Sequence, residues 1–233
     1  MNIESAISSL KNSLCQQVDV GGLFARSKLA HKWKAPWRSL LLREAVAWRI
    51  QELLEQSLLL SKNQGLLGAR ILLRSAFETL AVLVYLNKAM RSVVAGNLSF
   101  HDFSQKTSRL LIGSRDNSTS HEAIGVLVVL DSANKRYPGL RSWYDGLCES
   151  AHPNCEGVLG GYSSSDERNH ITTFASRWAD VHGGSHEEAL RACLVVFEVE
   201  YNHEWADAWT ALEHWIEKND EELEATRPHN TDE

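Results

Sequence analysis

The chain has 233 residues, of which 43% are hydrophobic and 23% are charged, and its formal net charge is −6. This length suits one large domain, and the ordinary globular composition argues against disorder except at the ends. The acidic balance excludes a strongly basic surface of the kind that lines nucleic-acid grooves, although it leaves room for a local basic patch. Residues 1–46 are locally basic and residues 187–233 are acidic, which indicates either internal charge complementarity, the interpretation we favour, or a partner surface.

The cysteines and the hydrophobic runs indicate in which cellular compartment the protein is expected. The four cysteines are widely spread, and residues 1–17 lack the basic start and apolar run of a signal peptide, so we expect reduced thiols. No uncharged apolar stretch reaches the roughly 18 residues that a helix needs to cross a bilayer. We therefore predict a cytoplasmic protein that makes no contact with a membrane.

Helical periodicity and end signals predict an all-α fold. The predicted helices cover residues 2–17, 36–62, 66–90, 99–111, 121–135, 140–151 and 185–219. Residues 18–35 are expected to form a loop, and residues 153–184 are irregular, with 171–178 either a short strand or a partial helix. The long C-terminal helix carries one apolar stripe from Leu190 to Trp215, which would brace a bundle or support a dimer. We predict a single helical domain over residues 1–220 and a polar, disordered tail over residues 221–233.

The helix at residues 66–90 is apolar on most of its circumference, which places it centrally among other helices. Its charged residues Arg70, Arg74 and Glu78 are spaced i, i+4 and i+8, so they share one edge. That edge could face water, where an Arg74–Glu78 pair would contribute little, or it could line a polar cleft. We place Arg70 at the water-facing edge and keep both interpretations for Arg74 and Glu78.

A second segment of interest is residues 144–155, in which a helix ends at His152, Pro153 and Asn154. A histidine at a helix C-terminus gains from the helix dipole when it is charged. It also titrates near neutral pH, which makes it a natural general acid or base. His152 is therefore either a structural cap or a catalytic group.

Metal binding is an alternative for the same segment. Cys148, His152 and Cys155 offer three zinc ligands within a short stretch, although a closed structural site needs a fourth. Helical bundles also hold di-iron pairs with two Glu-x-x-His motifs and two further glutamates. Candidates for these ligands are Glu149 with His152, Glu200 with His203, and Glu44 and Glu78.

Two segments together carry a family resemblance. Residues 74–78 contain an R-S-x-x-E pattern, and residues 144–154 read Y-x-x-L-C-E-x-x-H-P-N. The pair resembles a set of uncharacterised bacterial helical proteins that are similar to the HEPN superfamily, the higher-eukaryote and prokaryote nucleotide-binding helical bundles. The resemblance covers about residues 36–157.

The resemblance implies a four- or five-helix bundle that is often dimeric. Many HEPN members are ribonucleases of toxin–antitoxin, abortive-infection or CRISPR-linked phage defence systems, and others bind nucleotides or act as inactive scaffolds. The active members carry an Arg-x4–6-His motif. In this sequence that spacing occurs at Arg26…His31, Arg115…His121 and Arg177…His182, about as often as chance allows, and none coincides with the His152 segment.

These observations lead to one set of predicted site residues. Arg74 would hold a phosphate by a forked contact, His152 would act as general acid or base, and Glu78 would orient one of them. Tyr144 and Asn154 would contact the substrate. We predict no cofactor and no metal at this site.

The leading hypothesis is a HEPN-like defence or toxin-type protein that acts on RNA or a nucleotide. If it cleaves RNA, it would be a ribonuclease, and the sequence leaves open whether it is catalytic. Its partners would be a second copy of the chain and an antitoxin or defence-system protein. The alternatives are a non-catalytic helical interaction or sensor module, and a metal-binding bundle that holds zinc or di-iron.

Overall fold

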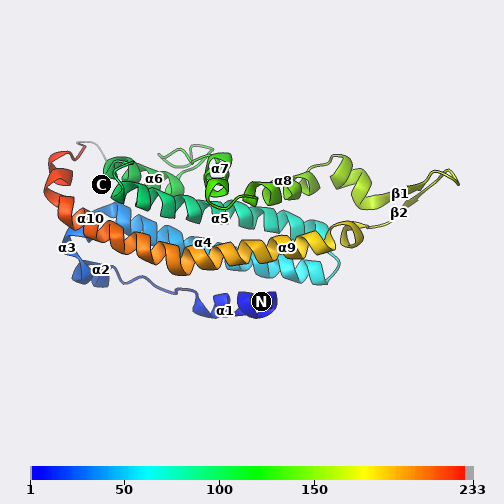
Figure 1. The fold of residues 1–233 in the computed structure, drawn as a ribbon, viewed down its shortest axis with the longest axis horizontal. Helices are drawn as coiled ribbons and strands as arrows, with labels where there is room; N and C mark the ends of the chain where they lie inside the picture. Colours follow the sequence, from blue (N-terminus) through cyan, green and yellow to red (C-terminus); the bar gives the residue numbers. More distant parts are fainter. Residues whose placement is uncertain (1, 229–233) are drawn as a thin grey trace. The chain divides into compact units, whose positions relative to one another are not determined.

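A computed structural model describes residues 2–228 and confirms the predicted all-α class (Figure 1). The α-helices are α1 (Ile3–Ser13), α2 (Val20–Arg26), α3 (Lys28–His31), α4 (Lys34–Lys62), α5 (Leu66–Val94), α6 (Phe100–Ile112), α7 (Val126–Arg136), α8 (Leu140–Ala151), α9 (Trp178–Val199) and α10 (Trp205–Ala225). Two π-helical segments, η1 (Cys155–Gly160) and η2 (Glu200–Glu204), follow α8 and α9. The chain is thus helical at almost every position where periodicity predicted a helix.

The irregular region after α8 contains a short antiparallel hairpin of β1 (Ser163–Asp166) and β2 (Ile171–Phe174). Ser163 lies opposite Phe174, and Asp166 lies opposite Ile171. The hairpin projects away from α8 and α9 (Figure 1). The open choice for residues 171–178 therefore resolves as a strand that ends at Phe174, followed by the start of α9 at Trp178.

Several boundary predictions were wrong, among them the end of the first helix, which was predicted at residue 17 and lies at Ser13. The predicted loop at residues 18–35 contains α2 and α3, because Ser27 caps α3 by accepting a hydrogen bond from the amide of Ala30 at 3.2 Å. Helix α7 begins at Val126 rather than at residue 121, because Ser114 and Glu122 form an isolated β-bridge in the segment before it. The last helical run begins at Trp178 and continues through η2, so it is longer than predicted.

The predicted tail at residues 221–233 is also partly corrected. Helix α10 continues to Ala225, because Leu223 is buried and anchors the last turns. Residues 229–233 lie outside the described residues.

The chain divides into two compact units. The first comprises Met1–Ser13, Trp48–Leu80 and Asn134–Val196, and the second comprises Leu14–Ala47, Ala81–Ala133 and Phe197–Glu233. Helices α4, α5, α7 and α9 contribute residues to both units.

The core of the first unit includes the start of α5 and the start of α9. Leu66, Ala69 and Trp178 are fully or almost fully buried and pack together, with Leu67 against them. Helix α8 buries Tyr144 and Leu147, which follow its apolar period. These apolar contacts fix the parts of α5, α8 and α9 that carry the polar side chains described in the next subsection.

The second unit has an aromatic core and a set of ion pairs. The Trp33 ring meets the Phe100 ring edge-on at 5.3 Å between centroids, and both are buried. Arg26 pairs with Glu213 at 2.6 Å, and Lys32 pairs with Asp220 at 2.8 Å. These pairs join the basic N-terminal stretch to the acidic C-terminal stretch, which confirms the internal charge complementarity expected from the sequence.

The four cysteines are free thiols. Among the described residues, no helix combines the length and the apolar character that a membrane span requires.

Candidate functional site

In the first unit, α5 and α8 are joined by Arg70. The Arg70 side chain is only 6% exposed, and it donates hydrogen bonds to the Ser150 hydroxyl at 2.6 Å and to the Gly146 carbonyl at 2.9 Å. The prediction that Arg70 faces water is therefore wrong, because groups of α8 cover this edge of α5. Burial lowers the pKa of the Arg70 guanidinium, and the charge of Glu156 opposes that effect.

One turn further along α5, Arg74 and Glu78 form a half-exposed pair that also reaches α8. The Arg74 Nη2 atom lies 3.3 Å from the Glu78 carboxylate and 3.3 Å from the Tyr144 hydroxyl. That hydroxyl donates to Glu78 at 3.1 Å. The hydrogen bond with Tyr144 raises the pKa of Arg74. The structure therefore brings together three of the five predicted site residues.

The other two predicted residues do not join this group. His152 is the exposed C-terminal cap of α8, and its backbone N–H donates to the Cys148 carbonyl at 3.1 Å. Within residues 2–228, its imidazole makes no hydrogen bond or ion pair. The Asn154 side chain accepts from the Gly157 amide at 3.0 Å and donates to Glu149, so it caps η1. Their observed contacts are those of helix caps.

A second polar group lies around Glu156, and the sequence did not single it out. The Glu156 carboxylate accepts a hydrogen bond from Ser150 at 2.6 Å and lies 3.8 Å from Nη2 of Arg70. The Nε2 atom of His182 lies 3.6 Å from the same carboxylate oxygen. The side chains of Glu156 and His182 are 33% and 14% exposed, so both can be reached from solvent. Arg70, Ser150, Glu156 and His182 are named the α5–α9 polar cluster below.

Local structure explains how the cluster is assembled. Asn154 starts η1, and a Cβ at Gly157 would lie 1.9 Å from the His152 carbonyl oxygen, so only glycine fits this turn. A Cβ at Gly161 would lie 2.5 Å from the Trp178 ring, which packs at 5.3 Å from the His182 ring. The turn at η1 thus presents Glu156, and the second turn of α9 presents His182.

The charges of the cluster favour a neutral imidazole. Burial and the positive charge of Arg70 lower the pKa of His182, while Glu156 opposes them. A histidine with a lowered pKa is mostly unprotonated at pH 7, and an unprotonated imidazole can accept a proton. The arrangement is therefore suited to general-base chemistry.

The one sequence signal for His182 was its spacing from Arg177, which matches the Arg-x4–6-His pattern. The other two matches are placed differently. His31 is 2% exposed and held by Glu213 at 2.7 Å, and His121 lies in the loop before α7 beside Ser120. Arg177 donates to the Ser163 carbonyl at the base of the hairpin. Of the three histidines, only His182 combines partial exposure with a carboxylate partner.

The positions of the side chains also bear on the zinc and di-iron alternatives, because metal ligands must lie close together. Within the part of the chain that the structure describes, no three histidine, cysteine, aspartate or glutamate side chains are grouped so that they could hold a metal ion. This holds for the set of Cys148, His152 and Cys155 and for the Glu-x-x-His candidates.

Comparison with known proteins gives no match: no protein-family model, no curated protein and no solved structure is similar to this chain.

Proposed function

We propose that the protein acts on RNA or a nucleotide at the α5–α9 polar cluster, with His182 as the general base. The observation that carries this proposal is the carboxylate of Glu156, which lies 3.6 Å from His182 and is held by Ser150 and Arg70. A base that is itself oriented by a fixed carboxylate is the arrangement that proton transfer in acid–base catalysis uses.

The chemistry expected at this site is transfer of the phosphoryl group within an RNA strand. His182 takes the proton of a ribose 2′-hydroxyl, whose oxygen forms a bond to the adjacent phosphorus. The bond from phosphorus to the 5′-oxygen of the next nucleotide breaks, and His182 returns the proton to that oxygen. The products are a 2′,3′-cyclic phosphate and a 5′-hydroxyl.

The family resemblance supports the same class of substrate. Its two segments lie in contact, because Arg74 of the R-S-x-x-E helix meets Tyr144, the first residue of the second motif. Arg74 is 31% exposed, so its guanidinium could also approach a phosphate, as predicted from the sequence. In this proposal His182 takes the role that the sequence assigned to His152, and the toxin or defence role follows from the resemblance alone.

The test is RNA cleavage by the purified protein and growth of a bacterial host after its induction. We expect the wild type to cleave RNA and slow growth, and His182→Ala to lose at least about a hundredfold in cleavage rate, as expected for a general base. His152→Ala serves as the matched control, because its imidazole has no partner among residues 2–228, and it should cleave as the wild type does. An intact RNA pool with wild-type protein would rule out RNA as the substrate, and equal loss in both variants would rule out His182 as the general base.

A second candidate function, a non-catalytic interaction module, is supported by exposed apolar side chains after α8. Phe174 of β2 is 79% exposed, and Leu159 of η1 is 60% exposed. Apolar side chains that reach solvent in this way often mark an interaction surface. The interaction-module function would be supported if Phe174→Ser abolished a defence phenotype and His182→Ala left the same phenotype intact.

A further inference from the structure

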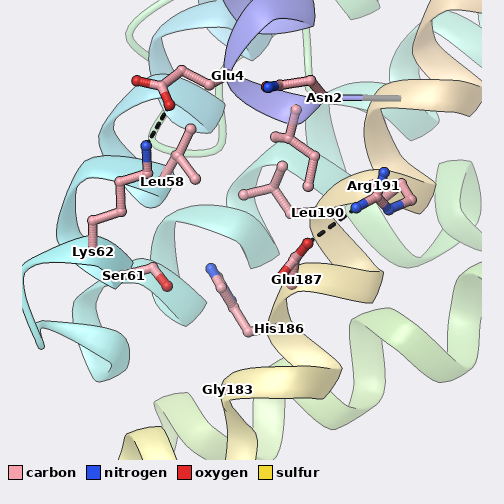
Figure 2. A pocket seen from close by; sticks show the side chains of 11 residues that line it. Asn2, Glu4, Leu58, Ser61, Lys62, Gly183, His186, Glu187, Leu190 and Arg191 are labelled. Atoms are coloured by element: carbon pink, nitrogen blue, oxygen red, sulfur yellow. Dashed lines mark hydrogen bonds and ion pairs between the residues drawn. The ribbon is translucent and has the colours of Figure 1, made fainter.

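A separate pocket of the first unit lies between α1, α4 and α9 (Figure 2). Its volume is about 370 Å³, which falls within the range of small-molecule sites. Ile3, Leu58 and Leu190 form apolar walls, and His186 lines the inner end. The pocket therefore has room for a compact molecule with an apolar body.

At the inner end of the pocket, one ring nitrogen of His186 has no hydrogen-bond partner among the described residues. The Ser57 hydroxyl donates its only proton to the Ala69 carbonyl at 2.8 Å, so it can only accept from Nε2 of His186, 3.4 Å away. Nε2 must then carry the proton, which leaves Nδ1 as an acceptor. His186 is 2% exposed, and its Nδ1 has no partner among the described residues. A buried acceptor without a donor is costly, so a ligand that supplies one gains binding energy.

That donor should be uncharged. Burial, with the positive charge of Arg70, lowers the pKa of His186 to about 4, so the imidazole is neutral at pH 7. The same surroundings would disfavour a cationic group on a ligand at this point. A hydroxyl or a ring N–H fits the inner end.

The outer end of the pocket carries two ion pairs, one on each of two opposite sides (Figure 2). Lys62 pairs with Glu4 at 2.6 Å on one side, and Arg191 pairs with Glu187 at 3.0 Å on the other. A ligand that bears both an ammonium and a carboxylate would find a partner of opposite charge for each.

We infer that this pocket binds a free zwitterionic α-amino acid whose aromatic side chain ends in a hydroxyl or N–H donor, and we take tyrosine as the probe of this class. The side chain lies between the apolar walls with its donor at Nδ1 of His186, and the α-ammonium and α-carboxylate meet the charged rim. Nδ1 is shielded from solvent, so binding requires a small rotation of the His186 ring toward the ligand, which the long bond to Ser57 opposes only weakly. The pocket uses neither His182 nor Glu156, so the inference does not rest on the proposed function.

Titration calorimetry with the full chain tests the chemical class of the ligand and needs no RNA cleavage. We expect L-tyrosine to bind, and L-phenylalanine, which lacks the hydroxyl, to bind about tenfold more weakly, since one net hydrogen bond corresponds to about that factor. Tyramine, which lacks the carboxylate, should also be weaker. No heat of binding with L-tyrosine, or equal affinity for L-phenylalanine, would overturn the inference.

Two adjacent glycines of α9 test its location. A Cβ at Gly183 or at Gly184 would meet nothing within 4 Å, but only Gly183 lines the pocket. Gly183→Leu should fill the pocket and abolish tyrosine binding, while Gly184→Leu should bind as the wild type does. Thermal unfolding shows whether each variant is folded. If Gly183→Leu does not fold, Ser61→Phe on α4 is the second variant that fills the same pocket. Binding that survives in a folded, filled variant would place the ligand elsewhere and overturn the inference.

Discussion

Arg70 and Arg74 are one helical turn apart on α5, and they differ sharply in environment. The Arg70 side chain is 6% exposed and bonds to Ser150 and Gly146 of α8, whereas the Arg74 side chain is 31% exposed. The buried guanidinium is compensated by its acceptors, as a buried charge must be. Arg70 therefore stabilises the packing of α8 on α5, while Arg74 remains available at the surface.

Replacing each arginine by methionine separates these roles. Arg70→Met keeps much of the apolar stem but leaves the Gly146 carbonyl and Glu156 without their cation, so we expect a loss of about 2–3 kcal/mol in the free energy of unfolding. Arg74→Met should cost less than about 1 kcal/mol, since a half-exposed pair contributes little. Urea denaturation measures the free energy of unfolding of both variants. Equal losses would show that Arg70 contributes no more than Arg74 to the packing of α8 on α5.

Periodicity alone could not distinguish the two arginines. The spacing i, i+4 places both on one edge of α5, but it does not show which part of that edge a second helix covers. The paired motifs predicted that Arg74 and Tyr144 belong to one site, but they did not predict a contact between the two side chains. The Ser150 contact to Arg70 was not predicted either, because a serine within a helix carries no signal of its partner.

At the scale of whole elements, the regular helices were the predictable part. Helix α8 was predicted with its exact ends, because a glycine turn precedes Leu140 and His152-Pro153 follows Ala151. The π-helix η1 and the hairpin were not predicted, since short polar strands and π-turns have no clear period. Glu156 lies within η1 and His182 follows the hairpin in α9, so their pairing could not be read from the sequence.

Two glycines of η1 test how strictly this element positions Glu156. Gly157→Ala would place a Cβ 1.9 Å from the backbone oxygen of His152, which cannot move without distorting the turn, so we expect a loss of about 1–3 kcal/mol. Gly160→Ala is the control, because its Cβ would lie 3.5 Å from the Cys155 oxygen, an ordinary contact. Thermal unfolding compares the stabilities, and hydrogen exchange of the α8 amides should quicken only in Gly157→Ala. A stable Gly157→Ala protein with unchanged exchange would contradict this view of η1.

At the scale of the whole molecule, the distribution of charge sets the response to acid. In the second unit, hydrogen bonds from His31 and Arg26 lower the pKa of Glu213, although burial opposes them. In the first unit, burial and Arg70 lower the pKa of His186 to about 4. A lowered pKa in the folded state means that the unfolded chain binds protons more readily, so both groups reduce stability as the pH falls.

The two contributions fall in different pH windows. Well above pH 6.5, His186 is neutral in the folded and unfolded chains, and its contribution is constant. As the pH falls from 6.5 towards 4, the unfolded chain takes up the proton first, which should lower the free energy of unfolding by roughly 3 kcal/mol. The Glu213 contribution is lost only as the pH falls through its own, lowered pKa.

The His186→Phe variant isolates the histidine contribution, because phenylalanine is similar in shape and does not titrate. Ser57 keeps its hydrogen bond to the Ala69 carbonyl in this variant, so the packing around it should persist. Urea unfolding at pH 7 and at pH 4.5 should then show a smaller difference for His186→Phe than for the wild type. His203→Phe on η2 replaces an exposed histidine and should leave the wild-type difference unchanged. If His186→Phe lost as much stability between the two pH values as the wild type does, the acid response would have to come from other titrating groups, such as His182 and the carboxylates, because only His186 has been made unable to titrate.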